Sequence, residues 1–209
     1  MKELLEVLRR SPVIAAVRGQ EALDAALASP VRIVFLLGGD PFTLPALTRR
    51  AREAGRPVFV HMDLVEGVGR DAAGVRWIAR MVKPEGILST RAPLLRAAAG
   101  EGLRTVLRMF LVDSSSLESG ERMIKSCAPD LVEVMPGLAT RAIARLGRSI
   151  AQPVIGGGML ERRADVEAVL RAGALAASTS NAALWTLAAW QDGKENGEYD
   201  GQNNGYGQP

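Results

Sequence analysis

Short apolar runs alternate with segments of helical period along most of this chain, and this alternation restricts the folds that the sequence can adopt. Val75, Ile78, Ala79 and Val82, for example, recur at the spacing of one helix face. A short apolar run between two such segments is typical of a strand covered on both faces of a parallel sheet. Eight such runs occur, at residues 13–17, 31–37, 58–61, 86–89, 104–110, 131–135, 153–155 and 174–177.

Eight strand–helix units within residues 1–190 predict a single domain, a compact (β/α)8 barrel of the TIM type with parallel strands. Apolar residues between positions 4 and 8 indicate a further helix ahead of the first strand. Ser115 and Glu118 have the spacing of a capping box that opens a later helix. The structural alternative is an open doubly wound sheet. Its early glycine-rich fingerprint is missing, because Ala-Val-Arg-Gly at 16–19 has the wrong spacing, so the sequence favours the barrel.

Residues 191–209 differ in composition from everything before them. They are polar and rich in glycine and asparagine, with one lysine against four acidic residues, so we expect a disordered tail. No apolar run approaches the roughly 18 residues of a membrane span, and the first residues lack the apolar stretch of a secretory signal. Cys127 is the single cysteine, which excludes an internal disulfide and a multi-cysteine metal site. We expect a cytoplasmic protein without a membrane partner, cofactor or metal.

Small residues follow the last two predicted strands. Gly156-Gly157-Gly158 comes after the seventh run, and Thr179-Ser180-Asn181 comes after the eighth and opens a helical segment. In barrels of this type, a phosphate often lies against the loops after strands seven and eight. Glycines let backbone N–H groups approach an anion, and a helix N-terminus adds unpaired donors. The pair of segments therefore predicts an anion site, although glycines that only form tight turns and a residue that only caps a helix are the alternative.

Charged and polar residues also lie at the ends of the other predicted strands. A buried charge needs a partner, so a ring of alternating arginine and acid could satisfy itself at this rim. For Arg108 and Glu133, a purely structural ion pair is an equally good interpretation, and His61 could be an ordinary core histidine. In chain order the rim residues are Arg18, His61, Asp63, the segment Ser89-Thr90-Arg91, Arg108 and Glu133.

The distribution of lysine bears on the chemistry that such a rim could perform. The lysines are Lys2, Lys83, Lys125 and Lys194, and none lies within a predicted strand or directly after one. A Schiff-base aldolase, which needs an amine inside the barrel, therefore has no candidate. Acid–base isomerisation by Asp63 or Glu133 remains chemically feasible. The residues alone thus predict a small phosphorylated ligand at the barrel rim without specifying a reaction.

Several ordered segments closely resemble the glycerol-uptake operon antiterminator family. The resemblance extends in collinear order over roughly residues 10–187. It implies a small TIM-type barrel that is a transcription antiterminator rather than an enzyme. Such proteins sense glycerol 3-phosphate and act on the leader mRNA of glycerol-utilisation operons. The matching segments are Val13–Arg18, His61–Gly67, Gly86–Arg91, Arg108–Ser115, Glu133–Gly137, Gly156–Gly158, Asp165–Gly173 and Ser178–Asn181, with Trp185 after them.

The resemblance and the barrel positions together suggest a role for each rim residue. We expect the phosphate at the two small-residue segments, the glycerol hydroxyls beside the acids and the histidine, and the arginines balancing charge. The expected phosphate contacts are Gly157, Gly158, Ser180 and Asn181; the hydroxyl contacts are His61, Asp63 and Glu133; the balancing cations are Arg18, Arg91 and Arg108.

Contact with RNA should depend on arginine, because no RNA-binding motif is present. Phe35, Phe59 and Phe110 lie in predicted strands and are expected in the core, which leaves few aromatics for base stacking. Ordinary solvated helix faces are the alternative for each arginine group, and RNA binding through them should depend steeply on salt. The two candidate groups are Arg49, Arg50 and Arg52, and Arg141, Arg145 and Arg148.

Three functions therefore stay in consideration. The first is a glycerol-3-phosphate-responsive antiterminator that binds leader mRNA, with RNA polymerase and a second copy of the chain as further partners. The second is an isomerase or epimerase of a small phosphorylated metabolite. The third is a metabolite-binding module that acts through a protein partner. The lysine distribution argues against many enzymes of this scaffold, and the lack of an RNA motif keeps the third hypothesis in play.

Overall fold

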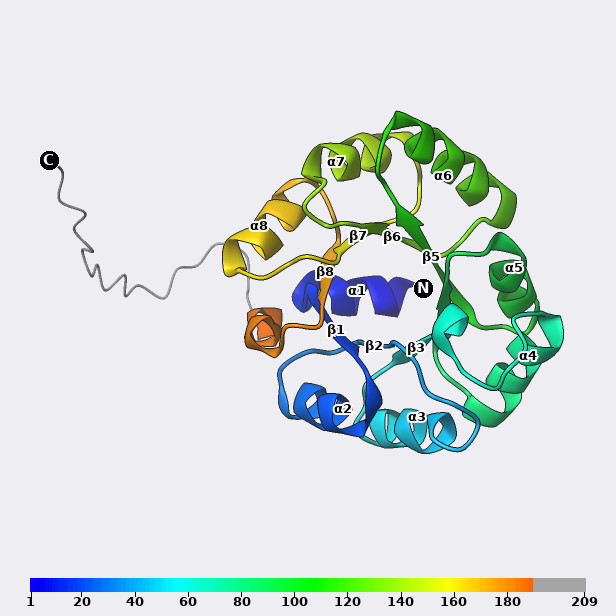
Figure 1. Ribbon diagram of the computed structural model, residues 1–209. Helices are drawn as coiled ribbons and strands as arrows, with labels where there is room; N and C mark the ends of the chain where they lie inside the picture. Colours follow the sequence, from blue (N-terminus) through cyan, green and yellow to red (C-terminus); the bar gives the residue numbers. More distant parts are fainter. Residues whose placement is uncertain (190–209) are drawn as a thin grey trace, which may run out of the picture.

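The computed structural model describes residues 1–189, which form a closed barrel of eight parallel strands in chain order (Figure 1). Pairing of β8 with β1 closes the ring. The predicted (β/α)8 barrel is confirmed, and the open doubly wound sheet is wrong, because such a sheet would leave its edge strands unpaired. The strands are β1 (Val13–Val17), β2 (Val34–Leu36), β3 (Val58–His61), β4 (Gly86–Ser89), β5 (Arg104–Phe110), β6 (Leu131–Met135), β7 (Val154–Gly157) and β8 (Ala176–Thr179).

Helices connect the strands and surround the barrel (Figure 1). The 3-10 helix η1 (Met62–Leu64) follows β3, η3 (Ala182–Ala189) follows β8, and the π-helical turn η2 (Ile78–Val82) continues α4. The predicted tail at 191–209 lies outside the described residues. The α-helices are α1 (Lys2–Arg10), α2 (Gly19–Ala28), α3 (Leu44–Glu53), α4 (Ala72–Trp77), α5 (Ala92–Gly100), α6 (Ser114–Cys127), α7 (Thr140–Ser149) and α8 (Arg163–Arg171).

Three strands differ in extent from the apolar runs that predicted them. β2 is shorter, since only Val34–Leu36 pairs with both neighbours. β7 continues through Gly156 and Gly157, and β8 continues to Thr179. The strand ends carry small residues because helices and neighbouring side chains pack closely against them. At Gly156, for example, a Cβ atom would collide with the side chain of Val169 on α8. The prediction that all three glycines follow the seventh strand is therefore wrong for the first two.

The start of α6 also differs from the predicted capping box. Asp113 is the N-cap, and its carboxylate accepts a hydrogen bond from the Ser116 N–H at 2.8 Å. Ser116 Oγ in turn accepts from the Asp113 N–H at 3.0 Å. The box thus uses an aspartate and a serine two residues ahead of the predicted Ser115 and Glu118, because Asp113 is extended and can accept from the first helical turn.

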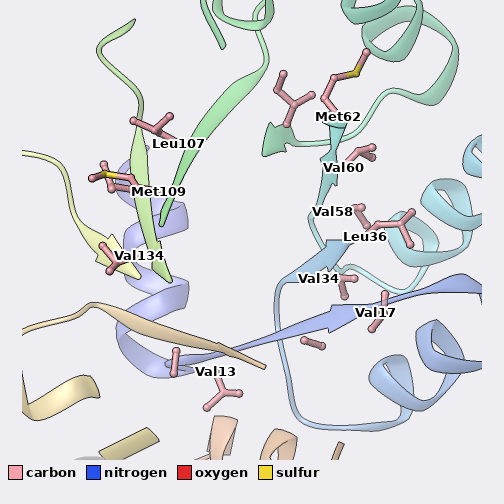
Figure 2. Close-up of a cluster of buried hydrophobic side chains, with 14 of the residues drawn as sticks. Val13, Val17, Val34, Leu36, Val58, Val60, Met62, Leu107, Met109 and Val134 are labelled. Atoms are coloured by element: carbon pink, nitrogen blue, oxygen red, sulfur yellow. The ribbon is translucent and has the colours of Figure 1, made fainter. Parts of the chain in front are cut away.

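Two hydrophobic layers hold the barrel together. One lies between the strands and the surrounding helices, and it contains outward-facing residues such as Val13, Val17 and Val34 (Figure 2). The other fills the barrel interior, where Ile14, Phe35, Phe59 and their neighbours meet. Burying each such side chain contributes roughly 1.5–3 kcal/mol. Successive side chains of a strand point to opposite faces, so each short apolar run contributes residues to both layers.

Helix α1 covers the amino end of the strands. Its buried residues Leu4 and Leu8 join the interior cluster, and the helix projects onto the centre of the ring in Figure 1. The barrel is thereby closed at this end, and the open rim is the carboxyl end of the strands, called the mouth below. None of the described helices has the length and apolar character that crossing a membrane requires.

Candidate functional site

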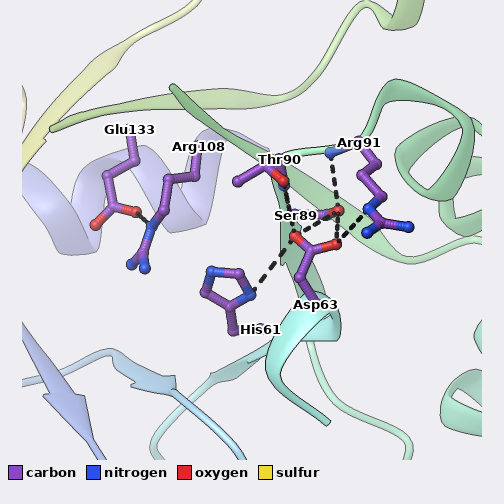
Figure 3. Close-up of polar contacts among 7 residues, drawn as sticks. All are labelled: His61, Asp63, Ser89, Thr90, Arg91, Arg108 and Glu133. Atoms are coloured by element: carbon purple, nitrogen blue, oxygen red, sulfur yellow. Dashed lines mark hydrogen bonds and ion pairs between the residues drawn. The ribbon is translucent and has the colours of Figure 1, made fainter. Parts of the chain in front are cut away.

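The predicted rim residues converge at the mouth because a parallel barrel brings every strand's carboxyl end to one side. Figure 3 shows His61 and Asp63 facing Ser89, Thr90 and Arg91, with the Arg108–Glu133 pair beside them. The strand register sets these neighbours: Arg108 is opposite Glu133, and Gly157 is opposite Ser178. These side chains therefore form one site rather than isolated rim positions.

A buried ion pair forms the floor of this site. Arg108 Nε donates to Glu133 Oε2 at 2.6 Å, and Ser178 Oγ donates to Glu133 Oε1. Glu133 is 0% exposed and Arg108 is 8% exposed, so Glu133 lies beneath its partners instead of lining the mouth. A Cβ at Gly157 would lie 2.7 Å from Glu133 Oε1, so only glycine leaves room here. Ser178 was not among the residues predicted for the site, although it lies two residues before Ser180, which follows the end of β8.

Asp63 ties the loop after β3 to the loop after β4. Its carboxylate accepts from Ser89 Oγ at 3.0 Å, from the Thr90 N–H at 2.7 Å and from Thr90 Oγ1 at 3.2 Å. Arg91 Nε lies 3.5 Å from Asp63 Oδ1. A carboxylate with this many donors is fixed in direction, so Asp63 presents a rigid, negatively charged wall. The roles of Ser89 and Thr90 as its donors were not predicted.

His61 is buried and electrically neutral at neutral pH. Its side chain is 4% exposed, and Nδ1 lies 3.8 Å from Asp63 Oδ2. Burial, reinforced by the charge of Arg108, lowers the pKa of His61 to about 4, although Asp63 opposes the shift. Nδ1 has no hydrogen-bond partner within residues 1–189. A buried imidazole with an unused nitrogen beside a fixed carboxylate is suited to a polar, uncharged group such as a hydroxyl.

The loops after β7 and β8 lie side by side, because their strands are paired. Gly158 and Met159 both have positive φ values, +76° and +59°, so the chain turns sharply after β7. Within the described residues, the N–H groups of Met159 and Ser180 donate to no backbone oxygen. Ser180 is exposed. Neighbouring free amides at the end of paired strands form the kind of concavity that binds an anion.

Asn181 connects these two loops. Its side-chain amide donates to the Glu161 carbonyl at 3.1 Å, and its Oδ1 accepts from the Ala183 N–H at 3.1 Å. Its own N–H donates to Thr179 Oγ1. Asn181 therefore holds the loops together, with its polar groups already in use.

Arg18 ends β1 as the N-cap of α2 and is exposed. Its positive charge contributes to lowering the pKa of His61, so it lies on the same side of the barrel. Elsewhere in residues 1–189, no group of three or more His, Cys, Asp and Glu side chains could hold a metal ion. The described lysines lie on α1, after η2 and on α6, outside the strands.

Comparison with known proteins identifies the family. A model of the family described as glycerol-3-phosphate responsive antiterminator matches residues 13–185. The chain belongs to this antiterminator family. The match runs from the first residue of β1 to Trp185 of η3 and so includes the whole mouth. It confirms the resemblance that the ordered sequence segments predicted.

Relatives of this protein are similar to it over nearly their whole length. It is 34% identical over 185 residues to YgcP, an uncharacterised protein of Escherichia coli K12, covering 88% of this chain and 97% of that protein. A glycerol uptake operon antiterminator regulatory protein from Listeria monocytogenes is 30% identical, with a TM-score of 0.80 and coverage of 83% and 94%. An antiterminator-related protein from Thermotoga maritima is 28% identical, with a TM-score of 0.75 and coverage of 84% and 98%.

The two arginine groups predicted to bind RNA do not meet in this protein. Arg49, Arg50 and Arg52 lie on α3, and the other group lies on α7 across the barrel (Figure 1). On α3, Arg50 pairs with Asp24 at 2.7 Å and Arg49 lies 4.0 Å from Glu53. Arg141, Arg145 and Arg148 are exposed and form no ion pair within residues 1–189.

The aromatic residues are also arranged differently from the expectation. Phe35 and Phe59 are buried, with ring centroids 5.7 Å apart, as predicted. Phe110 is 57% exposed, so its predicted place in the core is wrong. Phe110 lies two residues after Arg108 on β5 and therefore points to the same, inner side of the barrel. At that height the barrel interior is no longer filled by other side chains, so the ring is exposed. Phe42 is 92% exposed, on the loop after β2.

Proposed function

We propose that this protein binds glycerol 3-phosphate in the barrel mouth and, in that state, binds the leader mRNA of a glycerol-utilisation operon to prevent termination. Membership of the antiterminator family supports this function. The structural observation that carries the proposal is the presence of free amides at Met159 and Ser180 together with a neutral histidine and a fixed aspartate at the same mouth.

The phosphate would lie against the loops after β7 and β8. Gly157 and Gly158 let the chain pass close to the side chains of Ser178, Glu133 and Met135, and the amides of Met159 and Ser180 beyond them would donate to the phosphate oxygens. Ser180 Oγ adds a further donor. Asn181 acts by positioning the two loops through its bond to Glu161, which modifies the direct contact expected from the sequence.

The glycerol hydroxyls would face His61 and Asp63. Neutral His61 can donate or accept, and Asp63 has oxygens fixed in place by Ser89 and Thr90. Arg18, Arg91 and Arg108 would offset the charge of the phosphate. Because Glu133 is fully buried, it would act by orienting Arg108 and Ser178.

The regulatory role that we propose needs no chemical step. An isomerase or epimerase would need an acid–base group free to move a proton, yet Asp63 and Glu133 are both held by several donors. Less similar barrels, with 11–15% identity, include enzymes and share the fold alone. The gel shift described below distinguishes this function from that of a metabolite-binding module that acts on a protein partner.

Calorimetry tests the ligand site. We expect glycerol 3-phosphate to bind about 100-fold more tightly than glycerol, since two charge-assisted hydrogen bonds contribute roughly 1.5 kcal/mol each or more. Ser180→Asp should abolish this binding by repulsion without changing the unfolding midpoint. Ser119→Asp, at another exposed serine on α6, is the matched control. Equal affinities for the two ligands, or unchanged binding by Ser180→Asp, would contradict the site.

A gel shift with the leader transcript tests the output. Glycerol 3-phosphate should tighten RNA binding, and RNA should tighten ligand binding by the same factor, because coupling between binding sites is reciprocal. Typical couplings of 1–3 kcal/mol correspond to factors of about 5–150. A protein that binds the ligand but shifts no RNA at low salt would favour the function through a protein partner.

A further inference from the structure

A groove lies at the amino end of the strands, on the opposite side of the barrel from the mouth. Its larger part, of about 760 Å³, follows α1 and is lined by residues that include Ser11, Arg32 and Arg104. Its smaller part, of about 310 Å³, is lined by Thr48, Arg52, Arg56, Lys83 and neighbours. The two parts share Gly55, Pro57 and Glu85, so they form one continuous surface, called the basic groove below.

Cations gather in the basic groove without matching anions. Within residues 1–189, Arg32, Arg52, Arg56 and Lys83 form no ion pair. Glu85, the acid shared by both parts, lies 3.9 Å from Arg104 instead. Burial lowers the pKa of Arg56, and repulsion from the charge of Arg32 adds a smaller effect in the same direction. An anion in this groove would relieve that repulsion.

Buried polar atoms without partners line the same groove. Thr48 Oγ1, in a residue that is 2% exposed, and Ser11 Oγ, in a residue that is 5% exposed, have no hydrogen-bond partner in the described part of the chain. Arg56 Nε is also buried and unpartnered. Such groups are rare in folded proteins, because a buried polar atom without a partner destabilises the fold. Two hydroxyls and a guanidinium nitrogen are all able to donate to phosphate oxygens.

We propose that the basic groove binds the phosphate backbone of the leader RNA, with one phosphate in the smaller part between Thr48, Arg56 and Lys83. The inference rests on the proposed RNA-binding function and assigns a surface to it. The continuity of the two parts fits a chain of phosphates better than a single small anion. Of the arginines predicted from the sequence to bind RNA, Arg52 alone lines this groove, and the α7 group does not.

Charge removal in the groove tests the proposal. RNA affinity is measured by fluorescence anisotropy on the glycerol-operon leader at saturating glycerol 3-phosphate, for the full chain and for R56Q/K83Q. Through counterion release, each phosphate contact adds about 0.7–0.9 to the slope of log affinity against log salt concentration. At 0.1 M salt, relative to 1 M, each contact therefore raises the RNA affinity by a factor of about five to eight. The double variant should therefore bind about 25- to 60-fold more weakly, and its slope should fall by about 1.4–1.8.

The matched control is R145Q/R148Q, which removes two exposed charges from α7. It should change RNA affinity less than about twofold if the groove is the main contact. Loss of affinity in the α7 variant with none in the groove variant would overturn the groove and leave RNA binding intact. A third outcome is that millimolar inorganic phosphate competes with the RNA while R56Q/K83Q keeps the salt slope of the unmodified chain. This result would show that the groove binds a small anion and would also overturn the proposal.

Ligand calorimetry on the same variants separates the two proposals. Glycerol 3-phosphate should bind R56Q/K83Q as it binds the unmodified chain, because the groove and the mouth lie at opposite ends of the strands. If the unmodified chain binds glycerol 3-phosphate but no leader RNA, the proposed function fails and the groove assignment fails with it. If RNA binds the unmodified chain and the groove variant equally, the groove assignment alone fails.

Discussion

Replacing Glu133 alone should destabilise the barrel more than replacing it together with Arg108. The Glu133 carboxylate is 0% exposed and accepts from Arg108 Nε at 2.6 Å and from Ser178 Oγ. Glu133→Leu leaves the guanidinium, in a residue that is 8% exposed, without its anion. Removing one partner of a buried pair costs about 3–5 kcal/mol. Because Arg108 keeps slight access to the mouth, we expect about 3 kcal/mol.

The double variant R108M/E133L removes both charges and fills the space with apolar side chains. Such exchanges are often neutral, since neither charge must then be desolvated. The free energies of unfolding should therefore be far from additive, with a coupling energy of about 3 kcal/mol or more between the two positions. Arg108→Met alone should be intermediate, because it leaves Glu133 with Ser178 as its remaining donor.

Urea denaturation of the four proteins measures this cycle, provided that the denaturant slope stays constant among them. Calorimetry with glycerol 3-phosphate supplies a second readout, because the stable double variant should still lose ligand affinity once Arg108 is gone from the mouth. Single substitutions that each cost less than about 1 kcal/mol, or costs that simply add, would show that the pair is not a coupled buried unit.

Two further predictions concern neighbouring residues. His61 is the single histidine, so its NMR titration should report a midpoint near pH 4 directly. Because this pKa is lower in the folded state, the associated stability, up to about 3 kcal/mol, is present above about pH 6.5 and is lost as the pH falls towards 4. His61→Gln should flatten that loss, whereas a titration midpoint near 6.5 would contradict the burial. Gly157→Ala should cost about 1–3 kcal/mol by overpacking against Ser178 and Glu133 and weaken ligand binding. Gly147→Ala, with nothing within 4 Å, should be neutral or stabilising, and equal effects of the two would refute the steric argument.

The sequence was sufficient for the architecture because barrel closure follows from a repeated local pattern. Each short run between helical segments became a strand, and closing eight parallel strands necessarily brought His61, Asp63, Arg108 and Glu133 to one mouth. The ends of β7 and β8 were placed less well. Glycine has low strand propensity, so Gly156 and Gly157 gave no sign of belonging to β7.

Side-chain partners were less predictable, because they depend on rotamers and on depth within the barrel. The sequence placed Asp63 and Ser89 near one another but could not show that Ser89 and Thr90 would bind its carboxylate. The alternation of side chains along β5 predicts that Phe110 points into the barrel. It cannot show that the barrel interior around Phe110 is open to solvent. The basic groove as a whole escaped prediction because Arg32, Arg56 and Lys83 lie before three different strands, where no periodicity in the sequence brings them together.

Two strands connect the basic groove to the ligand site. Arg56 lies just before β3 and His61 ends it, while Lys83 lies shortly before β4 and Ser89 ends it. Each strand has four residues, a length of about 13 Å. Asp63 joins the far ends of both strands through Ser89 and Thr90. A ligand that binds Asp63 would therefore contact the joined ends of the two strands whose other ends carry groove cations. This arrangement would give the proposed ligand and RNA sites a short connection through paired backbone, and rigid secondary structure of this kind can carry coupling between distant sites.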